Sequence, residues 1–335
     1  MVGIISYAAS LPTLRLSADA YVEAWGSCGA RGMKQKAFCA YDEDPVTLGI
    51  AAARAALSRL GRNTPKIHAL FFGVTTPPYD EKPSASTIPT ALFDYMDIRV
   101  TEISGSPQAG MQAIISAVEY CAADAERYAV AIAADAPNGP PDASFEHAFG
   151  AAGTAFVIGP DGVVADFQGT LGVTRETFGA RFRRHGQEVL SDLELRTKDN
   201  LASAKMLGEQ CSVLGPVTRL ALGAEAGLMR GIGRAFGNPD AIVDTVWSQI
   251  GDAGSASAPF ALASAFDEMR INESVLAISL GSGGTACLFK TREGLAKNRR
   301  RGESVASLIR GGRTVGYLDY LKHKRFLSSR KGGNG

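Results

Sequence analysis

Two stretches of this chain follow the same order of elements, and this repeat constrains the fold more than any other feature. Residues 104–121 predict a small-residue turn and an almost wholly apolar helix, and apolar strands follow within 128–159. Residues 251–290 repeat that order. Strands that are apolar throughout are buried on both faces, and a helix that is apolar all round is central. The repeat predicts an α/β protein of two similar halves around buried helices at 108–121 and 254–269.

Composition limits the domain count and the class of partner. The chain has 335 residues, of which 45% are apolar and 21% charged, and its net charge is +1. No stretch is rich enough in linker residues to separate independent domains, so one fused unit is expected. We divide it into an N-terminal half (1–165), a C-terminal half (166–325) and a flexible tail (326–335). The balanced charge provides no general attraction to nucleic acid or to a membrane.

The first residues and the cysteines indicate the compartment. Residues 1–12 lack the basic start of a signal peptide and read as a first buried strand. No apolar run reaches the ~20 residues that span a bilayer. The cysteines have no metal-ligand spacing, so we expect no metal site and reduced thiols in the cytoplasm. They are Cys28, Cys39, Cys121, Cys211 and Cys287.

Local signals place further elements. Residues 42–61 predict a helix, with Pro45 near its start and a glycine at its end. A buried strand at 67–76 has its second-half counterpart at 217–225, which a helix follows. Residues 189–215 predict amphipathic helices that join the halves. The Pro/Gly-rich stretch 137–150 has no counterpart in the second half and reads as an inserted loop.

Segments spread along the whole chain carry a family resemblance; they are residues 2–12, 41–57, 69–86, 128–159, 250–269 and 317–326. They resemble prokaryotic 3-hydroxy-3-methylglutaryl-CoA synthases, which belong to the thiolase superfamily alongside ketoacyl synthase III. The resemblance implies a thiolase-like five-layer αβαβα fold of two βαβαβαββ halves, usually a dimer. It also implies a tunnel through which the pantetheine arm of coenzyme A reaches the N-termini of the buried helices.

The chemistry of that family needs a cysteine nucleophile at the first buried helix, a histidine beside the thioester and a glutamate that moves a proton. This sequence departs at all three positions. The cysteine position holds Pro107, or Ser106 with a one-residue shift. The glutamate position holds Thr75, and the histidine position holds Ala221 or Leu222. A family asparagine falls on Asp252. Three simultaneous losses predict that the reaction itself has been lost.

Three other features have both a functional and a structural interpretation. Ser106 is either a substitute nucleophile or a helix cap, and Pro107 directly after it favours the cap. His147 is either a base toward a bound thioester or a polar loop residue. The turn Gly281, Ser282 and Gly283 either borders an acyl or pantetheine pocket or is a strand-to-strand turn that needs positive φ angles.

The C-terminal region is basic. Runs at 297–302 and 310–313 are either sites for coenzyme A phosphates or an acidic partner, or solvated surface. The alternation in 317–326 predicts an edge that adds a strand to the sheet of another subunit.

Three functions remain open at this point. The favoured one is a catalytically degenerate synthase-like subunit that supports an active thiolase-type acyltransferase in a heteromeric complex, together with a zinc-ribbon/OB-fold protein. Such a synthase-like subunit without the cysteine has a counterpart in diacetylphloroglucinol acetyltransferases. The second is an active acyltransferase or condensing enzyme that uses Ser106 and His147. The third is a module that binds a coenzyme A thioester without catalysis. A second copy of the chain, in a dimer, is a further candidate partner.

Overall fold

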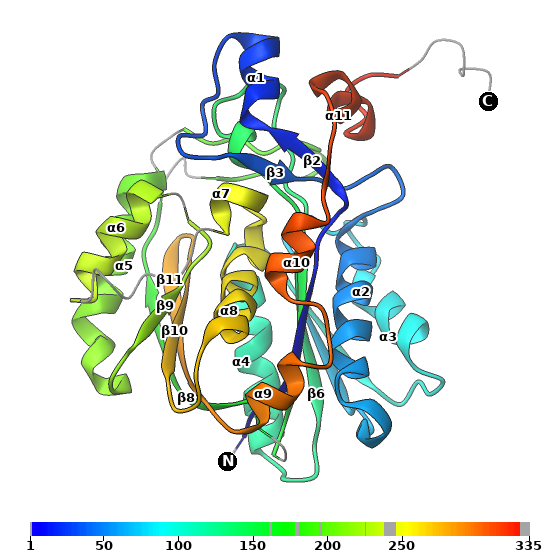
Figure 1. The fold of residues 1–335 in the computed structure, drawn as a ribbon, viewed down its shortest axis with the longest axis vertical. Coiled ribbons are helices and arrows are strands. Elements are labelled where there is room, and N and C mark those ends of the chain that lie inside the picture. The colour runs from blue at the N-terminus through cyan, green and yellow to red at the C-terminus, as the bar shows by residue number, and fades with distance from the viewer. Residues whose placement is uncertain are drawn as a thin grey trace.

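The computed structural model describes residues 2–160, 163–177, 181–193, 196–224, 226–237 and 246–328. Figure 1 shows two sets of strands on either side of a central pair of helices, with further helices outside. Layers of α, β, α, β and α follow one another, so the predicted five-layer α/β architecture is confirmed. Most of the expected tail 326–335 lies outside the described residues.

The first half contributes five strands. They are β1 (Gly3–Ser10), β4 (Ala69–Gly73), β5 (Arg99–Ile103), β6 (Ala129–Asp135) and β7 (Ala152–Gly159). Their spatial order is β5-β4-β6-β7-β1. Strand β4 is parallel to β5 and β6, whereas β7 is antiparallel to β6 and β1.

The described strands of the second half repeat this topology. They are β8 (Ala165–Thr174), β9 (Arg219–Ala221), β10 (Ser274–Leu280) and β11 (Gly283–Thr291), in the order β8-β11-β10-β9. Strand β9 is parallel to β10, and β11 is antiparallel to β10 and β8. Two residue pairs between β1 and β8 join the two halves into one sheet of nine described strands.

The two apolar helices lie side by side in the centre, as predicted (Figure 1). They are α4 (Ala109–Ala122) and α8 (Ser257–Glu268), and a 3-10 turn at Gly254–Ala256 precedes α8. Gly110 allows the close approach, because a Cβ built there would lie 2.1 Å from the Ser255 carbonyl oxygen. The helix N-termini therefore meet at one point between the halves.

Outer helices complete the layers. Helices α2 (Pro45–Ser58) and α3 (Thr87–Leu92) cover the first half, and α5 (Arg196–Gln210) and α6 (Ala226–Ala235) cover the second. Asp44 caps α2 by accepting from the Thr47 N–H at 2.7 Å, and Pro45 is the first helical residue, so this predicted helix is confirmed. Other 3-10 turns occupy Gly61–Asn63, Ser84–Ser86, Glu146–Ala148 and Cys211–Leu214.

A small subdomain lies at the top of Figure 1. Its sheet contains β2 (Leu14–Ser17), β3 (Gln35–Ala37) and β12 (Arg313–Thr314), and its helices are α1 (Ala18–Trp25), α7 (Trp247–Ile250) and α11 (Tyr317–His323). The predicted strand in 317–326 is wrong, because this segment forms α11. Tyr317, Tyr320 and Leu321 are spaced three and four residues apart, so one helical face packs them into the subdomain core.

The basic C-terminal run has structural contacts that its sequence did not reveal. It spans α9 (Gly294–Arg299) and leads to α10 (Val305–Arg310). Arg299 donates to the Met269 carbonyl at 2.6 Å, beside the end of α8, and Arg301 donates to the Arg59 carbonyl at 3.0 Å. Solvation alone therefore does not explain the run. Within the described ranges, no helix combines the length and apolar character needed to cross a membrane.

Candidate functional site

A cavity of about 110 Å³ lies where the N-termini of α4 and α8 meet the ends of β9 and β10. Its wall includes Pro107 before α4, Ser257 in α8, Leu222 after β9 and Ser279 in β10. The two halves thus contribute to one site, between the N-termini of the two buried helices. Among the described lining residues, only Arg181 and Asp252 carry a charge.

Asp252 organises one side of the cavity. Its Oδ1 accepts from the Gly254 N–H at 2.9 Å and from the Ser257 hydroxyl at 3.1 Å, and its Oδ2 lies 3.3 Å from Arg181 Nη1. Asp252 thus ties the turn before α8 and Ser257 to Arg181.

Asp135 is a buried acid at the end of β6 that the sequence reasoning missed. Its carboxylate accepts from the Thr75 hydroxyl at 2.6 Å, from the Thr76 N–H at 2.8 Å and from the Ser255 N–H at 2.9 Å. These contacts tie the end of β4 to the turn before α8. The available signal was an acidic residue directly after a wholly apolar strand.

The three positions at which the resemblance expects a catalytic cysteine, histidine and glutamate lie around the cavity or beside it. Pro107 and Leu222 line it, whereas Ala221 is buried in β9 opposite Ala277. Thr75 faces Asp135 and is not among the lining residues. No cysteine, histidine or glutamate occurs among the described residues of the cavity wall.

Ser106 and the glycine-rich turn contact each other. The Ser106 hydroxyl donates to the Gly281 carbonyl at 3.1 Å, and the Gln108 N–H approaches Ser106 Oγ at 3.3 Å. This local contact resembles a cap, although α4 begins at Ala109. Ser282 and Gly283 have φ angles of 51° and 113°, which the tight turn requires. The wall includes Ser279 and Leu280 but not Gly281–Gly283, so their role in acyl or pantetheine binding stays a prediction.

His147 belongs to a different environment from Ser106. Its Nδ1 accepts from the Gly29 N–H at 2.8 Å, its ring stacks on Tyr21 with centroids 3.9 Å apart, and its Nε2 lies 3.3 Å from Asp142 Oδ1. Burial lowers the pKa of His147 below its usual 6.5, which favours the neutral ring. The structure gives no hydrogen bond between His147 and Ser106, and His147 does not line the cavity.

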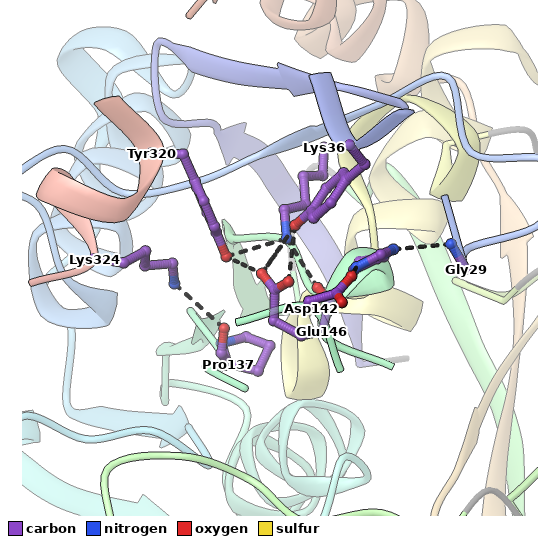
Figure 2. A network of polar contacts seen from close by, with 9 residues as sticks. Gly29, Lys36, Pro137, Asp142, Glu146, Tyr320 and Lys324 are labelled. Carbon is purple, nitrogen blue, oxygen red and sulfur yellow. Dashed lines mark hydrogen bonds and ion pairs between the residues drawn. The ribbon is translucent and has the colours of Figure 1, made fainter. Parts of the chain in front are cut away.

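A buried ion pair lies beside His147. Figure 2 shows Lys36 from β3 and Tyr320 from α11 converging on Glu146. Lys36 Nζ lies 2.8 Å from Glu146 Oε1, and the two side chains are 0% and 1% exposed. The Tyr320 hydroxyl also donates to Glu146, and that of Tyr21 donates at 2.9 Å. The contacts join the small subdomain to the loop 137–150.

Burial and the attraction between the two charges shift the pKa values of Lys36 and Glu146 in opposite directions. Burial lowers the pKa of Lys36 to about 8, against the attraction of Glu146. Burial alone would raise the pKa of Glu146, but Lys36 and the hydrogen bonds from Tyr320 and Tyr21 hold it below its usual 4.5. Both groups are therefore charged near neutral pH, and each depends on the other for its neutralisation.

No cysteine is among the described residues that line the cavity. Cys39, Cys121 and Cys287 are buried, and burial raises the pKa of each thiol to about 12. They act as small apolar residues rather than nucleophiles, as predicted. Cys211 begins a 3-10 turn, and burial raises its pKa also. The described part of the chain contains no group of three or more His, Cys, Asp or Glu side chains that could hold a metal ion.

Comparison with known sequences gives long but distant matches. No protein-family model matches the chain. It is 28% identical to the hydroxymethylglutaryl-CoA synthase of Methanobrevibacter smithii, over 97% of this chain and 99% of that one. The corresponding protein of Archaeoglobus fulgidus is 29% identical, over 98% of this chain and 100% of its own length.

Solved structures agree on the fold. A structure of hydroxymethylglutaryl-CoA synthase complexed with CoA has a TM-score of 0.85 at 16% identity and covers 100% of this chain and 92% of its own. The synthase of the curacin biosynthetic pathway, in complex with holo donor-ACP, has a TM-score of 0.82 at 18% identity and covers 96% and 87%. The chain is therefore hydroxymethylglutaryl-CoA synthase-like in sequence over nearly its whole length, and its fold is the thiolase-like fold of those synthase structures.

Proposed function

We propose that this chain is a noncatalytic, synthase-like subunit that supports an active thiolase-type acyltransferase. The observation that carries the proposal is the cavity itself. It lies at the junction of the two halves, yet its described wall offers Pro107 and Leu222 where the related chemistry needs a thiol and an imidazole. Its serine hydroxyls are engaged, because Ser257 donates to Asp252 and Ser279 donates to the Pro107 carbonyl at 3.0 Å.

The isolated protein is expected to form no acyl adduct and no condensation product with acetyl-CoA or acetoacetyl-CoA. A serine hydroxyl needs an adjacent base for nucleophilic attack, and Ser106 donates instead to a backbone carbonyl. Intact-protein mass spectrometry after incubation checks this result. A stable adduct that disappears in Ser106→Ala would contradict it and favour the active acyltransferase.

Pro107→Cys provides the matched positive control for that measurement. The substitution places a thiol on the cavity wall at the N-terminal end of α4, where the helix dipole favours a thiolate. We expect the variant to gain one acetyl group by thioester exchange but to form no condensation product, since the described cavity wall holds neither the histidine nor the glutamate that the related chemistry needs. The same experiment therefore tests whether a coenzyme A thioester reaches the cavity.

The proposed partners are a catalytically competent thiolase-type subunit and a zinc-ribbon/OB-fold protein. An acyl carrier protein is a further candidate, since the curacin synthase is described in complex with one. Exposed apolar side chains support a protein-binding surface on α1 and α11. Val22 and Leu318 are 49% and 58% exposed there, and Trp25 of α1 contacts Tyr317 of α11.

Co-expression with a thiolase-type subunit from the native host is expected to yield a stable complex, and removal of this chain is expected to abolish the acyltransferase activity of that complex. Leu318→Glu should weaken co-purification, because it places a charge within the apolar surface. Met96→Glu is the matched control, since Met96 is also 58% exposed but lies outside α1 and α11. A self-contained dimer that binds no thiolase would instead favour the thioester-binding module.

A further inference from the structure

A second cavity, of about 510 Å³, lies at the opposite end of the strands from the first, where the C-terminal end of α2 meets α9. Tyr128 lines it directly before β6 begins, whereas Asp135 ends β6 beside Gly254 of the first cavity. A strand rises about 3.3 Å per residue, so β6 separates the two cavities by about 20 Å. They share no described lining residue. Figure 1 shows α9 below the central helices and α7, which contributes to the first cavity, above them.

The wall of the second cavity carries an excess of positive charge. Arg59, Lys297 and Arg301 line it, and Glu293 is the one acidic residue among its described lining residues. Lys297 and Arg301 are exposed and belong to the basic run 297–302. The ion pairs found among the described residues involve none of the three cations. The basic run therefore faces a cavity that has no counter-charge of equal size.

Arg59 is a buried cation whose contacts are all to uncharged groups. It is 3% exposed, and its Nη1 approaches Asn298 Oδ1 at 3.4 Å while its Nη2 donates to the Glu303 backbone carbonyl. Its guanidinium carbon lies 4.7 Å from the centre of the Tyr7 ring. A buried charge without an opposite charge is unfavourable. An anion in the cavity would offset it without touching it, because the attraction acts over several ångströms in a medium of low dielectric constant.

Arg301 and Lys297 are the groups that can contact such an anion. Arg301 Nη1 donates to the backbone carbonyls of Arg59 and Leu60 at 3.0 and 3.2 Å, which fixes the guanidinium at the end of α2. Its Nε and Nη2 have no partner within the described residues. A guanidinium presents paired donors to phosphate oxygens, and an ammonium adds a point charge. The two side chains together suit a phosphate group.

Charge and size indicate what carries the phosphate. Three cations and one carboxylate leave two positive charges, and a phosphate monoester carries about −1.5 to −2 at pH 7. A volume of about 510 Å³ is in the range of sites for small organic ligands, of about 300–1,000 Å³. Apart from the charged residues and Asn298, the described wall is apolar or glycine: Ile5, Leu60, Pro65, Tyr128 and Gly294.

We propose that this second cavity binds a small organic phosphate. Lys297 and Arg301 contact the phosphate oxygens, and the apolar part of the wall contacts the body of the ligand. The site is separate from the first cavity, so the inference goes beyond the proposed function and does not depend on it.

Calorimetric titration of the full chain at low salt, with AMP, phenyl phosphate, inorganic phosphate and adenosine, tests the assignment. Both organic phosphates are expected to bind more tightly than inorganic phosphate, and adenosine at least tenfold more weakly than AMP. Lys297→Met should weaken the binding of AMP about tenfold, the effect of one hydrogen bond to a charged donor. Lys297→Arg should keep it. Lys297 is exposed and makes no side-chain contact among the described residues, so neither change should alter the unfolding temperature.

Arg310→Met is the matched control, because Arg310 lies in the neighbouring basic run 310–313 and does not line the cavity. It should leave the affinity for AMP unchanged. The inference is overturned if none of the three phosphates binds, if inorganic phosphate binds as tightly as the organic ones, or if adenosine binds as tightly as AMP. It is also overturned if AMP binds equally to wild-type protein and to Lys297→Met, since the nucleotide would then occupy another place on the molecule. The titration needs no partner protein, so its result is independent of the noncatalytic function.

Discussion

Lys36→Met lowers the free energy of unfolding by about 3–5 kcal/mol, the usual loss when one partner of a buried ion pair is removed. The reason is that Glu146 stays buried after the change. Lys36 Nζ donates to both Oε1 and the backbone carbonyl of Glu146 at 2.8 Å, and the tyrosine hydroxyls that remain do not neutralise the carboxylate. Denaturant unfolding at pH 7 measures the loss.

Two matched variants test whether the loss of stability comes from leaving the Glu146 charge buried without its partner. Lys66→Met removes the cation of an exposed pair, in which Lys66 Nζ lies 2.6 Å from Asp97 Oδ2, and should leave the unfolding midpoint unchanged. Adding Glu146→Met to Lys36→Met should recover most of the loss, because two apolar side chains of similar volume can replace a buried ion pair. A double variant as unstable as the single one would show that the charge is not the cause.

The loss of stability in Lys36→Met should become smaller as the pH falls. In the wild-type protein the pKa of Glu146 is held below 4.5, so its contribution to stability is full above that value and is lost as the pH falls through the folded-state pKa. In Lys36→Met, burial acts without the ammonium and raises that pKa, so the folded variant binds the extra proton and gains stability as the pH falls. The difference between the two proteins should therefore narrow between pH 7 and about 4.5.

Gly110→Ala is expected to destabilise the protein by about 3 kcal/mol, at the upper end of overpacking effects. The new Cβ would lie 2.1 Å from the Ser255 carbonyl oxygen and 2.7 Å from the Ala133 Cβ, so α4 would have to move away from the start of α8. Alanine favours a helix over glycine by about 1 kcal/mol, which offsets only part of this cost. Thermal unfolding measures the result.

Gly172→Ala is the control for the central contact. A Cβ at Gly172 in β8 meets nothing within 4 Å, so this change should be neutral or slightly stabilising. If Gly110→Ala were as stable as Gly172→Ala, the close packing of α4 against the turn before α8 would be incorrect. The meeting point of the two helix N-termini, and with it the position of the cavity, would then have to be revised.

Local sequence was sufficient for most of the fold because the decisive signals are short-range. The apolar runs of β6 and β10 and the largely apolar helices α4 and α8 reveal burial directly, and Asp44 with Pro45 marks the start of α2. The tail shows the limit of such patterns. Alternating residues in 317–326 predicted a strand, but packing of Tyr320 into the small subdomain selects a helix, α11.

The candidate site was also predictable from local sequence only in part. Of the positions that the sequence singled out, Pro107, Leu222 and Asp252 line the cavity, whereas Thr75, Ser106 and Ala221 are not in its described wall. It missed Arg181, which reads as one of several arginines in a polar stretch, and it treated Asp135 as the end of a strand. Whether such a charge is solvated or buried depends on elements that are distant in sequence.

The sequence by itself determined the repeated α/β halves, the central helices and the absence of a cysteine at the N-terminus of the first of them. Only the tertiary structure decided which charges are buried and what they contact. Arg181 meets Asp252 across 71 residues, Lys36 meets Glu146 across 110, and Asp135 meets Ser255 across 120. The physical reason is that hydrophobic periodicity is a property of neighbouring residues, whereas the desolvation of a charge depends on the whole fold that surrounds it.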